Sequence, residues 1–89
     1  MNPLRRMHLL RTLLETLSYA QGYAVPEPAL RPQVDGLLRP PTSDGEWADA
    51  VKDLSAPARG AIVQVPAELD PELKQWAITE RGRVLLATL

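Results

Sequence analysis

The sequence predicts a mainly α-helical fold with a small β-hairpin near its C-terminal end. Three observations indicate this fold: leucines recur at helical spacing early in the chain, a capping-box sequence begins at Ser43, and residues 61–65 and 76–78 are β-compatible. A chain of 89 residues has the size of one compact domain, so we expect residues 1–89 to fold as one. The predicted order is helix, strand, helix, helix, strand, strand, helix.

The first helix is expected at residues 3–20. Asn2 can accept hydrogen bonds from the free N–H groups of the first turn, and Pro3 suits the first helical position. Gly22 is the expected stop because glycine readily adopts the backbone conformation that follows a helix. The apolar face of this helix consists of Leu10, Leu13, Leu14 and Leu17.

A short edge strand and a second helix come next. Residues 23–25 are β-compatible, and we expect Pro26 to end this strand. Pro28 suits the first turn of the second helix, whereas Pro32 lacks the N–H of a helical hydrogen bond and is expected either to kink this helix or to delay its start. The apolar face comprises Leu30, Val34, Leu37 and Leu38.

The third helix is expected at residues 44–54. It begins with a capping box, in which the side chains of Ser43 and Glu46 each bond to the other residue's backbone N–H. Trp47 and Trp76 are expected as core anchors first, with base stacking as their alternative role. The apolar face of the helix comprises Trp47, Ala48, Ala50, Val51 and Leu54.

The C-terminal third is expected to form a hairpin and a last helix. Residues 61–65 and 76–78 would pair as strands, joined by the loop 66–74. Thr79 can cap the helix that follows. Three apolar residues are expected to return this helix to the core, namely Val84, Leu85 and Leu86.

Residues 76–86 run from a strand through Thr79 and Gly82 into an apolar helix. This segment resembles the exit from the wing in winged helix-turn-helix domains of MarR-, PadR- and ArsR-like bacterial and phage proteins, and the order of predicted elements is also theirs. The resemblance implies that the second and third helices form the helix-turn-helix, that the third helix enters the major groove, and that residues 66–74 are the wing. It therefore implies a small, phage-like, DNA-associated or transcription-regulatory protein.

The charge pattern argues against docking DNA through the third helix itself. The chain carries a net charge of −1, and the third helix has four acidic side chains against Lys52. Acidic groups near phosphate lower affinity because they do not release counterions. We therefore assign candidate DNA contacts outside the acidic set, with ordinary surface ion pairing as the alternative role of the arginines. The candidates are Arg31, Arg39, Arg59 and Lys74.

The alternative function is a protein-interaction module that does not bind DNA. The acidic third helix would dock on a basic partner through Asp44, Asp49 and Asp53, unless this face is merely solvated. The acidic wing would join that contact through Glu68, Asp70 and Glu72. The first helix could support a homodimer or an acidic partner through Arg5, Arg6 and Arg11.

Composition argues against several kinds of site. The chain has no cysteine and therefore neither disulfides nor thiolate metal ligands. Its one histidine, His8, stands without other ligands at metal spacing, and no recognisable base accompanies Ser18, Ser43 or Ser55. We expect no catalytic residues, no cofactor and no metal. The apolar runs are shorter than a signal peptide or a membrane span, so we expect a cytoplasmic protein that does not bind membranes.

Overall fold

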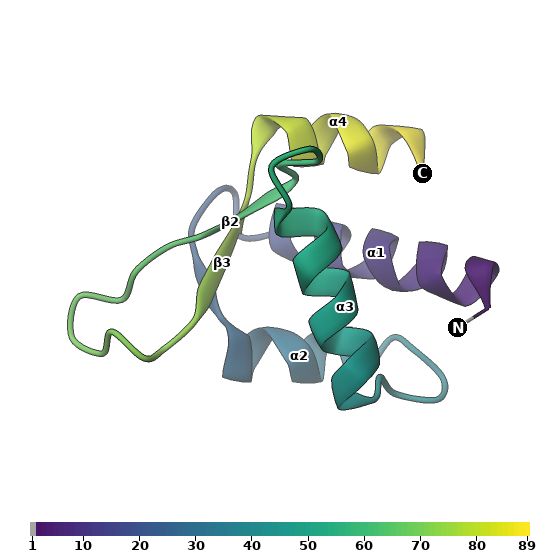
Figure 1. Ribbon diagram of the computed structural model, residues 1–89, viewed down its shortest axis with the longest axis horizontal. Coiled ribbons are helices and arrows are strands. Elements are labelled where there is room, and N and C mark those ends of the chain that lie inside the picture. Colours follow the sequence, from purple (N-terminus) through teal and green to yellow (C-terminus); the bar gives the residue numbers. More distant parts are fainter. Residues whose placement is uncertain (1) are drawn as a thin grey trace.

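The computed structural model describes residues 2–89 and contains four helices and a three-stranded antiparallel sheet in that range. The elements are α1 (Pro3–Ser18), β1 (Val25–Pro26), α2 (Glu27–Asp35), α3 (Asp44–Ser55), β2 (Ile62–Gln64), β3 (Gln75–Ile78) and α4 (Glu80–Thr88). Their order along the chain is the predicted one. In Figure 1, α3 crosses in front of α1, α2 and α4 lie on opposite sides of α1, and the hairpin loop extends away from the helices.

Helix α1 begins where the sequence predicts and ends two residues before the predicted end at residue 20. The Asn2 side chain accepts a hydrogen bond from the Leu4 N–H at 2.8 Å. After Ser18 the chain reverses through a turn in which Gln21 and Gly22 have φ values of 54° and 90°. The predicted leucine face is buried, together with Leu9.

The sheet has β3 at its centre, with β1 on one edge and β2 on the other. Val25 lies opposite Trp76, and Ile62 lies opposite Ile78. The first strand ends at Pro26, as predicted, but Pro26 is itself the last residue of β1, and residues 23 and 24 lie outside the strand. An edge strand tolerates proline because one side of its backbone needs no partner in the sheet.

Helix α2 is shorter than its apolar pattern indicates. It begins at Glu27, so Pro32 lies inside the helix and does not delay its start. It ends at Asp35, before the last two leucines of the predicted face. Leu38 is nevertheless buried, whereas Leu37 is 65% exposed and its predicted core position is wrong. The helical spacing stops applying to Leu37 because the helix has already ended.

Helix α3 carries the predicted capping box. The Glu46 N–H donates to Ser43 Oγ at 3.2 Å, and the Ser43 N–H donates to Glu46 Oε1 at 3.0 Å. The buried face consists of Trp47, Ala50, Val51 and Leu54. Ala48 is exposed, which corrects its predicted place in the apolar face.

Helix α4 packs closely against the sheet. Thr79 Oγ1 accepts a hydrogen bond from the Gly82 N–H at 3.1 Å, as its predicted capping role requires. A Cβ at Gly82 would lie 2.1 Å from the Ala61 carbonyl oxygen, so only glycine fits there. Leu85 and Leu86 pack against the core, but Val84 is exposed, contrary to the prediction.

The core lies between α1, α2, α3 and the sheet. Leu13, Leu14 and Leu17 of α1 are fully buried in it, as are Leu30 of α2 and Leu54 of α3. Across residues 2–89, none of the helices is both long enough and apolar enough to cross a membrane.

Candidate functional site

Each acidic side chain of α3 forms an ion pair with an arginine that lies outside α3. The arginines come from α1, α2 and the loop between α3 and β2, so they approach α3 from several sides. The pairs are Arg5–Glu46, Arg6–Asp49, Arg6–Asp53, Arg31–Asp44 and Arg59–Asp53. Four arginines thus balance four carboxylates, and the charge of −3 expected for this helix is compensated within the fold.

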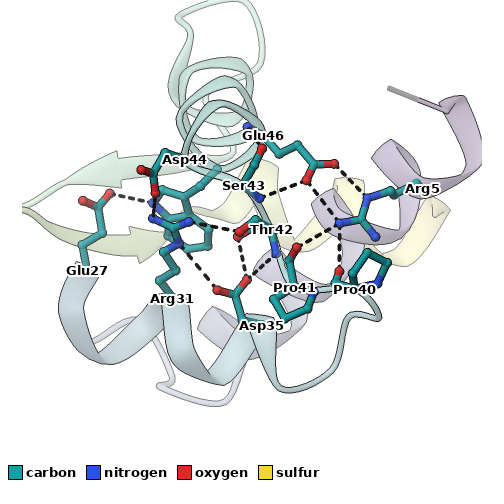
Figure 2. Close-up of polar contacts among 11 residues, drawn as sticks. Arg5, Glu27, Arg31, Asp35, Pro40, Pro41, Thr42, Ser43, Asp44 and Glu46 are labelled. Carbon is teal, nitrogen blue, oxygen red and sulfur yellow. Dashed lines mark hydrogen bonds and ion pairs between the residues drawn. The ribbon is translucent and has the colours of Figure 1, made fainter.

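Glu46 accepts hydrogen bonds from Arg5 and from the backbone of Ser43. Arg5 donates to it twice, from Nε to Oε2 at 2.8 Å and from Nη2 to Oε1 at 3.2 Å (Figure 2). The same Nη2 also donates to the carbonyl oxygen of Pro40 at 2.8 Å. The hydrogen bonds from Arg5 and from the Ser43 N–H lower the pKa of Glu46 from 4.5 to about 2.

Asp53 is shared between two arginines. It accepts from Arg6 Nη2 at 2.7 Å and from Arg59 Nε at 2.9 Å, while the other terminal nitrogen of Arg6 binds Asp49. The hydrogen bonds that Arg6 donates to Asp49 and Asp53 raise the pKa of Arg6. These contacts join the first turn of α1 to the middle and the last turn of α3.

Arg31 connects α2 to the start of α3. Its Nη1 donates to Asp44 Oδ1 at 2.7 Å and its Nη2 to the Thr42 carbonyl oxygen at 3.1 Å, as Figure 2 shows. The guanidinium carbon lies 5.9 Å from the centre of the Trp47 ring, within the range of a cation–π contact. Arg31 thus holds the helix pair α2 and α3 together.

The four residues predicted to contact DNA do not gather in one place. Arg31 and Arg59 are ion-paired with α3, and Arg39 is exposed in the loop after α2. Each of the four, Lys74 included, lines a different surface hollow. The residues predicted to form an acidic docking face are Asp44, Asp49 and Asp53. Each is paired with an arginine: Asp44 with Arg31, Asp49 with Arg6, and Asp53 with both Arg6 and Arg59.

A groove of about 340 Å³ lies between α3 and the hairpin. Two lysines line it, Lys52 from α3 and Lys74 from the segment that leads into β3. The other lining residues are Glu27, Trp47, Ala48, Val51, Ser55, Gln64 and Trp76. The groove therefore combines two cations and one carboxylate with amide, hydroxyl and indole groups.

Glu27 fixes the two tryptophans that line this groove. Its Oε1 accepts a hydrogen bond at 3.1 Å from Nε1 of Trp47 and another at 3.1 Å from Nε1 of Trp76. Both rings are at least 94% buried, so they are core anchors, as predicted. One carboxylate at the start of α2 thereby positions α3 against β3.

Lys52, Gln64 and Glu27 are not among the site residues that the sequence predicts. For Lys52 a signal was present, because helical spacing places it with Ala48 and Ser55 on one side of α3. The acidic side chains Glu46, Asp49 and Asp53 lie at other angles, toward α1. No sequence signal identifies Glu27 and Gln64 as site residues, because their positions beside the groove depend on the tertiary packing.

The remaining candidates have local roles in the structure. Ser43 caps α3, while the hydroxyls of Ser18 and Ser55 donate to carbonyl oxygens one turn back. His8 is exposed on α1. Within residues 2–89 there is no cluster of three or more histidine, cysteine or carboxylate side chains that could hold a metal.

The tip of the hairpin carries the acidic residues predicted for the wing. Glu68, Asp70 and Glu72 are all exposed there, and Leu69 between them is 100% exposed. Asp70 Oδ1 accepts from the Glu72 N–H at 3.1 Å, which shapes the turn.

Comparison of the chain with protein-family models, with curated proteins and with solved structures gives no match.

Proposed function

We propose that the chain is a winged-helix domain that binds duplex DNA through α3 and the adjoining groove, and that it acts as a non-enzymatic regulator of transcription. The order of elements and the hairpin between α3 and α4 support the class. One observation carries the proposal: the acidic side chains of α3 are already paired with arginines of the same chain. The charge that opposes phosphate is therefore compensated.

The outward surface of α3 fits close approach to a duplex. Gly45 and Ala48 are exposed and small, so the backbone of α3 can approach base edges. Lys52 and Lys74 stand beside the same groove and would contact phosphates. Gln64 and Ser55 line the same groove and supply hydrogen-bonding groups there.

The acidic hairpin tip limits this contact to the base of the hairpin. Three carboxylates near the phosphates would lower affinity, so the tip must lie away from the backbone of the duplex. With few lysines at the interface, we expect weak binding at physiological salt. DNA binding should therefore be measured at low salt, where phosphate contacts contribute most to the affinity.

The test is a salt titration of binding to a random-sequence duplex, followed by fluorescence anisotropy. The variants Lys52→Gln and Lys74→Gln each remove one phosphate contact, which should lower the log–log salt slope by about 0.9 and weaken binding at low salt. Arg11→Gln is the matched control, because Arg11 lies on α1 outside the groove. Absence of binding by the wild-type chain at low salt, or equal effects of all three substitutions, would contradict the proposal.

The alternative function, docking on a basic protein, is supported by the hairpin tip alone. The α3 carboxylates are engaged with arginines, whereas the tip presents a fully exposed Leu69 among acidic side chains. If this tip is the docking site, Leu69→Ser should abolish capture of a basic partner and leave DNA binding unchanged. Capture that survives Leu69→Ser would remove this alternative.

A further inference from the structure

A hollow of about 430 Å³ lies on α4, beside the loop between α3 and β2, and is called the α4 hollow below. Its apolar lining consists of Ala58 from the loop and of Val84 and Leu85 from α4. Val84 is 59% exposed, so the side chain that the sequence places in the core lines this surface hollow instead. The volume is within the range of clefts that bind small groups, so an apolar side chain of another molecule fits there.

Two arginines line the α4 hollow beside its apolar part. Arg81 forms no ion pair within residues 2–89, and its terminal nitrogens contact only two carbonyl oxygens of the loop, at 3.4 and 3.5 Å. Arg59 donates to Asp53 through Nε alone, so its two terminal nitrogens remain available. Glu80 also lines the hollow and opposes one of the two positive charges. The hollow therefore combines apolar surface with guanidinium groups that can still bind carboxylates.

The tip of the hairpin has the complementary composition. Leu69, which is 100% exposed, stands between Glu68 and Asp70, and Glu72 follows two residues later. None of these three carboxylates forms an ion pair in the part of the chain that the structure describes. In Figure 1 the hairpin loop extends away from the helices, so the tip does not reach α4 of its own chain.

We propose that the α4 hollow binds the hairpin tip of a second copy of this chain. Leu69 of the partner subunit packs against Val84 and Leu85, and the carboxylates on either side of it meet the guanidinium groups of Arg59 and Arg81. Charge complementarity selects this occupant, because unpaired carboxylates on one surface meet available guanidinium groups on the other. Contact of tip with tip would instead bring like charges together.

The contact is head-to-tail, because the tip and the α4 hollow are different surfaces of each copy. A copy that is bound through its hollow still presents its own tip to a further copy. Across residues 2–89, the α4 hollow and the groove between α3 and the hairpin share no lining residue. The inference therefore goes beyond the proposed DNA binding, and either can fail while the other stays testable.

The test is sedimentation equilibrium of the chain over a micromolar to millimolar concentration series. Leu69→Ser removes the apolar side chain of the tip, and Val84→Asp places a negative charge in the hollow. Each variant alone should associate at least about tenfold more weakly than the wild type. In an equal mixture, the Leu69→Ser chain still has an intact hollow and the Val84→Asp chain an intact tip. The mixture should therefore form a 1:1 heterodimer, a recovery that merely destabilised chains would not show.

Substitutions of single charges on α4 give an independent test. Arg81→Gln should weaken the association about threefold, and Glu80→Gln should strengthen it about threefold because it removes the carboxylate that opposes the acidic tip. Arg83→Gln is the matched control, since Arg83 lies on the same helix outside the hollow. A wild-type chain that remains monomeric throughout would assign both surfaces to other molecules and overturn the proposal. A mixture of Leu69→Ser and Val84→Asp that stays monomeric, or equal effects of Arg81→Gln and Arg83→Gln, would also overturn it.

Discussion

Glu46 connects three parts of the chain through one carboxylate. It completes the capping box of α3, receives two hydrogen bonds from Arg5 of α1, and lies beside the loop that Arg5 also contacts at Pro40. The capping-box motif predicts the contact with Ser43, but no sequence motif predicts the contacts with Arg5. Glu46 therefore both completes the N-terminal cap of α3 and binds this helix to α1.

The lowered pKa of Glu46 makes the fold sensitive to acid. The folded pKa of about 2 lies below the reference value of 4.5, so the stabilisation is complete above pH 4.5 and is lost as the pH falls toward 2. Glu46→Gln keeps the capping geometry but removes the titrating group, so its urea midpoint should fall less over this interval than that of the wild type. Glu68→Gln, on the hairpin tip, is the control. Identical pH profiles for Glu46→Gln and the wild type would refute this role.

Glu27 gives a second prediction for a single side chain. Glu27→Ala leaves the indole N–H groups of Trp47 and Trp76 buried without their acceptor, at a cost of about 1–3 kcal/mol each. Glu27→Gln keeps an acceptor oxygen and should cost much less. Urea denaturation followed by tryptophan fluorescence measures both variants. Equal stability of the two would show that the shared acceptor does not matter.

At the scale of elements, the close packing of α4 on the sheet depends on Gly82. A methyl group there meets the backbone of Ala61 and the side chain of Ile78, so Gly82→Ala should destabilise the fold by about 1–3 kcal/mol. Gly45→Ala is the matched control, because a Cβ at that exposed position of α3 meets nothing within 4 Å. Thermal unfolding should show a lower midpoint for Gly82→Ala and an unchanged or slightly raised one for Gly45→Ala. An unchanged midpoint for Gly82→Ala would contradict the packing argument.

The sequence predicts the elements well where a local signal exists. Asn2, Ser43 and Thr79 each cap the helix that they were expected to start, since capping needs only neighbours within three residues. The apolar pattern wrongly places Leu37 and Val84 in the core. Apolar periodicity shows which residues share a face, but not where a helix ends or which part of its face another element covers.

At the scale of the whole molecule, the fold brings together charges that are distant in sequence. Arg5 and Arg6 lie more than forty residues before the carboxylates that they bind. No local pattern could predict these pairs, so the sequence indicates an acidic helix and a scattered set of arginines. The structure instead leaves Lys52 and Lys74 beside one groove. Of these two lysines, the sequence predicts Lys74 as a DNA contact but does not predict Lys52.

We propose that α3 and the base of the hairpin form the surface that contacts DNA. An amide chemical-shift titration of the ¹⁵N-labelled chain with a short duplex at low salt would locate that surface. We predict that the largest shifts fall on Gly45, Ala48 and Lys52 of α3 and on Gln64 and Lys74 of the hairpin. Shifts confined to residues 66–73 or to α1, or no shifts at all, would contradict it.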